Sequence, residues 1–180
     1  EPAHASQALL DQLNAARDRV GELLGAVESH GYDLPDNRFD SVAILEVIRI
    51  VEALISRIRP TIVYTHQAGD LNVDHAVVHR AVLTATRPGT CPVRELYAFE
   101  IPSSTEWAFG QLEPRFSPNT FVDVSTTLDR KLEAMELYRS EARSFPHPRS
   151  PEALRALAVL RGSQASLEAA EAFQLIRKIG

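Results

Sequence analysis

The sequence is poor in several features, and each shortage excludes a class of protein. Its 180 residues include a single cysteine, a single methionine and a single tryptophan. One cysteine, Cys91, excludes an intramolecular disulfide, and we expect it to be a small core residue. No apolar run approaches the roughly 18 residues of a membrane-spanning helix, and the acidic start does not resemble a basic signal peptide. A cytoplasmic protein without a membrane span is therefore predicted.

Clustered basic charge is also absent. The chain has 19 Lys and Arg residues against 24 Asp and Glu, a formal net charge of -5, and its basic residues are scattered. Nucleic-acid binding depends on clustered positive charge, so small molecules are the expected partners. With 44% hydrophobic residues, the composition is that of one globular domain over residues 1–180. The sequence leaves oligomeric state open, and a homo-oligomer is compatible with it.

Hydrophobic spacing predicts alternating helices and strands in the first 101 residues. Apolar residues repeat at helical spacing after a Ser6 cap as far as Val27, and again from Val42 to Ile58 before Pro60. Short β-rich runs follow at Thr61–Tyr64 and Val93–Ile101, with a helix that Asp74 can cap between them. Alternation of this kind predicts an α/β fold with parallel pairing, which places ligands at the carboxyl ends of the strands.

Other elements are predicted from shorter signals. The run from Val27 to Leu34 ends in a turn and is interpreted as a strand, and Phe121–Asp123 is interpreted as another. A helix is expected from about Thr126 to Ala142. Ser150-Pro151-Glu152 is a good helix start, and helices flanking Gly162 are expected to lead into residues 173–176.

The segment Thr61–Arg80 carries the clearest chemistry, because a β-rich run ends there in a loop dense in metal-ligand side chains. Six such side chains occupy fourteen positions, and carboxylate with imidazole is the ligand set of a borderline ion such as zinc. The six residues are His66, Asp70, Asn72, Asp74, His75 and His79.

Three other interpretations of this segment are a calcium-binding loop, a helical metalloprotease motif and a polar loop without a metal. A calcium loop would need Gly and Glu where the chain has His75 and Ala81, and a helical metalloprotease motif would need Glu in place of Ala76. His79 is expected to make a packing or surface contact. His66 ends a buried strand and stays open between a site role and a structural one. A polar loop with a capping Asp and scattered histidines is the remaining alternative.

The segment Gly69–His75, followed by Val78–Val82, resembles the PIG-L or LmbE-like family of zinc-dependent N-deacetylases. The resemblance extends over nearly the whole chain. Supporting motifs of one bacterial branch lie at Leu34–Arg38, Phe99–Trp107 and Phe145–Ser150.

The resemblance implies a Rossmann-like, three-layer α/β/α fold with a mostly parallel sheet, and removal of acetyl groups from N-acetylated amino sugars or glycoconjugates. The family holds zinc through two histidines and an aspartate, and His75 matches the histidine that follows the Asp of an Asp-His pair. Asp74 would orient its neighbours. Many relatives have a histidine at Asn72. Asn72 can donate a hydrogen bond to an oxyanion but cannot carry a proton, so His66 would have to serve if acid catalysis is required.

The same resemblance implies substrate contacts on other loops. Arg38 suits a bidentate contact with a phosphate, and Trp107 could stack on a sugar face. The full set of expected substrate-binding residues is Asp36, Arg38, Glu100, Trp107, His147 and Arg149.

The family's early His-Pro-Asp-Asp motif, which supplies two zinc ligands and the catalytic base, does not occur in this sequence. Its only His-Pro is His147-Pro148, followed by Arg149. We therefore expect an initial strand-helix-strand of at least ~30 residues to precede this sequence. Two alternatives are a degenerate, non-catalytic relative that acts as a binding partner or subunit, and a nucleotide-binding Rossmann protein. The latter needs a Gly-rich turn that these residues do not contain.

Overall fold

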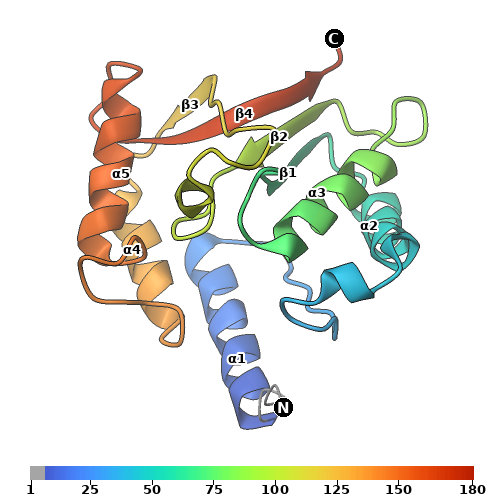
Figure 1. The fold of residues 1–180 in the computed structure, drawn as a ribbon, viewed down its shortest axis with the longest axis horizontal. Helices are drawn as coiled ribbons and strands as arrows, with labels where there is room; N and C mark the ends of the chain where they lie inside the picture. Colours follow the sequence, from blue (N-terminus) through green and yellow to red (C-terminus); the bar gives the residue numbers. More distant parts are fainter. Residues whose placement is uncertain (1–6) are drawn as a thin grey trace. The chain divides into compact units, whose positions relative to one another are not determined.

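Residues 7–180 are described by a computed structural model, in which they form two compact units (Figure 1). One unit contains residues 34–122 and 171–180, and the other contains the residues up to 33 and residues 123–170. The first unit carries the segment rich in metal-ligand side chains. The single domain expected over residues 1–180 stays a prediction.

The described residues contain a four-stranded sheet in the order β1-β2-β4-β3 (Figure 1). Strand β1 (Ile62–His66) pairs in parallel with β2 (Glu95–Phe99), and His66 lies opposite Phe99 in the register. Strand β4 (Ala170–Lys178) runs antiparallel to β2, and β3 (Thr120–Asp123) lies beside β4. The predicted α/β class and the predicted strands at 61–64, 93–101 and 121–123 are confirmed.

Two helices supply most of the hydrophobic core of the first unit. Helix α2 (Ile44–Ile58) follows the short 3-10 helix η1 (Phe39–Ser41) and packs on α3 (Val73–Ala85), which also contacts β1. Helix α2 ends at Arg59, which adopts a left-handed conformation before Pro60. The buried core residues are Val47, Ile48, Ile55, Ala81, Ala85 and Val93.

Helices dominate the second unit. Helix α4 (Leu128–Leu137) contacts both α1 (Gln7–Leu24) and α5 (Pro151–Ser163). The predicted start of α5 is confirmed, because the Ser150 hydroxyl accepts the Ala153 N–H at 3.1 Å and Pro151 occupies the first turn. No helix among residues 7–180 is long and apolar enough to cross a membrane.

Two predictions of secondary structure are wrong. Residues 27–34 form no strand, because the chain leaves α1 through Gly25 at φ 73° and continues as turns and irregular backbone without a pairing partner. A single helix, α5, contains Gly162, and residues 173–176 belong to β4.

The predicted helix caps need one correction. The cap of α3 is Asn72, whose side chain accepts the Asp74 N–H at 2.8 Å, so Asp74 itself is not the cap. The predicted Ser6 cap lies outside the described residues.

Candidate metal centre

Strand β1 and helix α3 bring two histidines together at the carboxyl end of the sheet. His66 is the last residue of β1, and His75 lies in the first turn of α3. Their rings stack with centroids 4.3 Å apart and planes 15° from parallel. The other neighbour of His66 is Phe99, at the end of β2, with ring centroids 5.1 Å apart. This is the edge of the sheet where α/β folds place their ligands.

The Asp70 carboxylate holds the His75 ring at its Nδ1. Asp70 Oδ1 lies 2.9 Å from His75 Nδ1, and the Asp70 side chain is fully buried. Burial alone raises the pKa of Asp70, but hydrogen bonds from His75, Ser104, the Asn72 backbone and Thr105 outweigh burial and lower it from 3.8 to about 2. The carboxylate is therefore ionised at neutral pH, and Nε2 is the ring nitrogen of His75 that remains for a metal.

His66 is a neutral imidazole at physiological pH. Burial, followed by the nearby His75, lowers its pKa from 6.5 to about 4. Its Nδ1 is buried and has no hydrogen-bond partner among residues 7–180. The His66 carbonyl oxygen lies 2.8 Å from His79 Nδ1, so the buried His79 ties α3 to the end of β1. His79 thus makes the packing contact expected from the sequence.

Asp74 faces away from His75 and holds the loop that precedes η1. Its two carboxylate oxygens accept the backbone N–H groups of Asn37 at 2.7 Å and Phe39 at 2.9 Å. Asn72 contributes to the same arrangement, because its Nδ2 donates to Asn37 Oδ1 at 3.2 Å. The sequence predicts that Asp74 orients neighbouring residues. In the structure, the residues that it contacts are Asn37 and Phe39.

Two of the predicted substrate residues lie on this loop. Asp36 accepts a hydrogen bond from Asn37 Nδ2 at 3.0 Å, and Arg38 is exposed to solvent. Asn37 itself adopts φ 55°, a left-handed conformation that Asn tolerates better than most residues. Sequence reasoning did not select Asn37 or assign a site role to Asp70. The signal for Asn37 was its place in a Pro-Asp-Asn turn, where left-handed conformations are frequent.

The other predicted substrate residues fall in two places. Glu100 directly follows β2, at the same end of the sheet as His66, and Trp107 lies in the 3-10 helix η2 (Glu106–Ala108) with 40% of its surface exposed. His147 and Arg149 belong to the second unit. There the Arg149 N–H donates to His147 Nδ1 at 3.1 Å. The Arg149 guanidinium pairs with Glu141.

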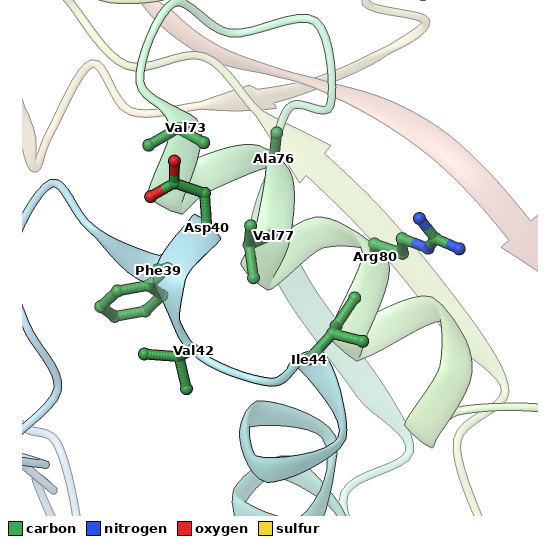
Figure 2. Close-up of a pocket in the computed structure, with 8 residues that line it drawn as sticks. All are labelled: Phe39, Asp40, Val42, Ile44, Val73, Ala76, Val77 and Arg80. Carbon is green, nitrogen blue, oxygen red and sulfur yellow. The ribbon is translucent and has the colours of Figure 1, made fainter.

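A pocket of about 340 Å³ lies between η1, the start of α2 and helix α3 (Figure 2). Its walls are mostly apolar, while Asp40 and Arg80 place opposite charges along its rim (Figure 2). The Asp74 carboxylate holds the backbone of Phe39, which lies in the pocket wall. The lining residues are Phe39, Asp40, Val42, Ile44, Val73, Ala76, Val77 and Arg80.

The donor set fits part of a zinc site. His75 has one nitrogen fixed by a carboxylate and one remaining, as in carboxylate–histidine–zinc arrangements. The rings of His66 and His75 are stacked and nearly parallel. Because a metal binds in the plane of each imidazole ring, one ion cannot be bound by both. No group of three or more His, Cys, Asp or Glu side chains within residues 7–180 is placed to hold a metal. Among these residues, His75 is the candidate ligand, and Asp70 supports its ring.

The fold is that of an α/β protein, with two stacked histidines and a buried carboxylate at the end of β1 and the start of α3. The sequence profile of the PIG-L family, described as GlcNAc-PI de-N-acetylase, matches residues 5–86. This match covers β1, the ligand-rich loop and α3. The PIG-L or LmbE-like resemblance predicted from the sequence is thereby confirmed. No curated protein sequence matches the chain.

Solved structures share the fold at low sequence identity. A conserved protein from Thermus thermophilus aligns with a TM-score of 0.74 and 19% identity, over 94% of this chain and 75% of that one. The 4-carboxy-2-hydroxymuconate hydratase from Pseudomonas putida aligns with a TM-score of 0.69 and 20% identity, over 100% and 77% of the two chains.

The third structure is the N,N'-diacetylchitobiose deacetylase from Pyrococcus horikoshii, in complex with its inhibitor MPG. It aligns with a TM-score of 0.70 and 16% identity, over 96% of this chain and 66% of that one. Identities this low show a common fold alone. Since a hydratase and a deacetylase both have this fold, the reaction must be argued from the side chains.

Proposed function

We propose that this protein is a zinc-dependent hydrolase that removes an N-acetyl or other N-acyl group from an amino sugar or glycoconjugate. One observation carries the proposal: His75, within the segment that matches the PIG-L profile, has Nδ1 on a buried carboxylate and Nε2 remaining. The PIG-L match and the fold shared with a chitobiose deacetylase support a deacetylase-type function. Zinc and the acylated amino sugar are the finer parts of the proposal.

His75 Nε2 would hold the zinc, with Asp70 keeping the ring in place. Bound zinc would lower the pKa of a water molecule to about 7 and polarise the acyl carbonyl. Asn72 stands at the start of α3, three residues before His75, and its amide Nδ2 can donate a hydrogen bond to the oxygen that becomes negative during the attack. His66, neutral at pH 7, lies against His75 and could accept or donate a proton near the leaving amine.

The substrate side of the proposal rests on the loop at residues 36–38. Asp36 could accept hydrogen bonds from sugar hydroxyls, and Arg38, whose side chain is exposed, could bind a phosphate or another anionic part of a conjugate. Asp74 fixes the backbone of this loop relative to α3, on which His75 lies. Substrate contacts and the metal ligand are thus joined by one buried carboxylate. Glu100, Trp107, His147 and Arg149 remain candidate substrate contacts.

The first experiment measures zinc content and acetate release for the purified protein and for His75→Ala. We expect His75→Ala to lose most bound zinc and all hydrolysis of N-acetylglucosamine conjugates, because the ring supplies a metal ligand. His30→Ala removes an exposed histidine from the other unit and is the matched control, with unchanged zinc content. Full zinc occupancy in His75→Ala would overturn the ligand assignment.

The proposal requires two more zinc ligands and a catalytic base, which a His-Pro-Asp-Asp motif ahead of Glu1 would supply. N-terminal sequencing and intact mass of the native protein test this requirement. The second candidate function is that of a non-catalytic binding partner or subunit. It is favoured because no group of three or more His, Cys, Asp or Glu side chains within residues 7–180 is placed to hold a metal. A native protein that begins without the motif and binds no zinc would support this second candidate.

A further inference from the structure

Both carboxylate oxygens of Asp70 make polar contacts with neighbouring residues. Its Oδ1 accepts the Asn72 N–H at 2.9 Å and a hydrogen bond from the Ser104 hydroxyl, and it also contacts His75 Nδ1. Its Oδ2 accepts the Thr105 hydroxyl at 2.8 Å. Only 2% of Asp70 is exposed, so these contacts replace water almost completely.

The groups around Asp70 are arranged as donors. The Asn72 N–H can only donate. The Thr105 oxygen accepts the Ile101 N–H at 2.8 Å, which directs its own proton toward Asp70. Asp70 is thus surrounded by donors and acts as an acceptor toward each neighbour. His75 Nδ1 must then carry a proton to complete the contact, and the lone pair of the neutral ring is on Nε2.

We propose that Asp70 is a positioning residue that fixes His75 in the Nδ1–H tautomer and sets the direction of its Nε2 lone pair. This inference rests on the proposed function, in which Nε2 binds zinc. The in-plane hydrogen bond from Nδ1 fixes the rotation of the ring, and the stacked His66 ring limits its tilt. Ser104 and Thr105, from the segment after β2, act through Asp70 by donating hydrogen bonds to its carboxylate and holding it beside His75.

The role in zinc binding follows from this geometry. A carboxylate on the far nitrogen of a metal-binding histidine raises the basicity of the ring and orients it, and removing such a partner typically costs about 10- to 100-fold in metal affinity. Asp74 makes no such contribution, because its carboxylate is committed to the backbone of Asn37 and Phe39. The two carboxylates therefore give a matched pair of variants.

The test has one measurement on the metal-free protein and one on zinc binding. Long-range ¹H–¹⁵N correlation spectra of the metal-free protein should show His75 in the Nδ1–H tautomer. In Asp70→Asn a mixture of tautomers is expected, with zinc bound about 10- to 100-fold more weakly in calorimetric titrations. Asp70→Glu, which keeps an acceptor, should restore part of that affinity. Asp74→Asn, the matched control, should leave the His75 tautomer unchanged.

The outcomes separate this proposal from the proposed function. His75 in the Nε2–H tautomer in the unsubstituted protein, which needs no variant to fold, would overturn the positioning role. Unchanged zinc affinity in a folded Asp70→Asn would also overturn it. The Nδ1–H tautomer in a protein that binds no zinc would support the hold of Asp70 on the ring while refuting the zinc-dependent reaction.

Discussion

Asp70 and Asp74 stand four residues apart at the start of one helix, and both are buried, with 2% and 8% of their surfaces exposed. Asp70 turns toward the end of β1, where it accepts from His75, Ser104 and Thr105. Asp74 turns toward the loop before η1 and accepts from two backbone N–H groups. The partners of each carboxylate, supplied largely by distant segments, thus decide whether it holds the His75 ring or the backbone of Asn37 and Phe39.

The largest effect is expected for Asp70→Ala. This change leaves two hydroxyls, a backbone N–H and His75 Nδ1 without a buried acceptor, and should lower the free energy of unfolding by about 3 kcal/mol. Urea denaturation in the presence of a chelator measures the loss without a contribution from bound metal. A smaller loss than in Asp74→Ala would contradict the ranking of the two carboxylates.

Gly69, the residue before Asp70, packs closely against the backbone of Leu112 and Pro114, and Gly69→Ala tests this packing. A Cβ at Gly69 would lie 2.2 Å from the Pro114 carbonyl oxygen and 2.8 Å from that of Leu112, so the backbone must shift, at a cost of roughly 2 kcal/mol. Thermal unfolding measures the change. The control is Gly21→Ala in α1, where a Cβ meets neighbours only at 3.8 Å or more and should stabilise the helix by about 0.5 to 1 kcal/mol. Equal effects in the two variants would refute the packing argument.

Asp74→Ala should cost about 2 kcal/mol, because it leaves the N–H groups of Asn37 and Phe39 without their acceptor. Hydrogen exchange gives the sharper measurement, since these two amides should lose protection while amides in β1 keep theirs. If protection at Asn37 and Phe39 persists, the carboxylate does not hold the loop. The expected loss would confirm that Asp74 serves a different segment from Asp70.

The smallest effect is expected at Asn72, which lies between the two carboxylates. Asn72→Ala removes the acceptor of the Asp74 N–H and should destabilise the protein by about 1 kcal/mol. Asn72→Asp keeps a capping oxygen and should recover most of that stability, but it loses the amide donor. Steady-state kinetics then separates the two roles, because a stable Asn72→Asp with unchanged kcat would exclude Asn72 as an oxyanion donor.

The sequence predicted the parts of the fold that local patterns control. β-branched residues before His66 and the proline at 60 indicated β1 and the end of α2, and Ser150-Pro151 located α5. The false strand at 27–34 had the right residue types, but a strand also requires a pairing partner, which a single segment does not reveal. A helix was also expected after Gly162, where the chain instead turns and enters β4.

The site was predicted only in part because its contacts are long-range. His75 and Asn72 could be selected from their motif, and the structure places both at the start of α3. Two of the partners of Asp70, Ser104 and Thr105, lie 34 and 35 residues further along the chain, and those of Asp74 lie 37 and 35 residues earlier. The sequence assigned an orienting role to Asp74 and no site role to Asp70, because it does not reveal which of the two carboxylates contacts the His75 ring.

The position of Trp107 gives this protein a built-in optical probe. It is the single tryptophan of the chain, it lies in η2 two residues after Thr105, and it is 40% exposed. Tryptophan fluorescence therefore reports on the segment in which the Ser104 and Thr105 hydroxyls donate to Asp70, with no background from other indoles. Loosening of that segment should appear as an emission shift in unlabelled protein, well before the whole chain unfolds.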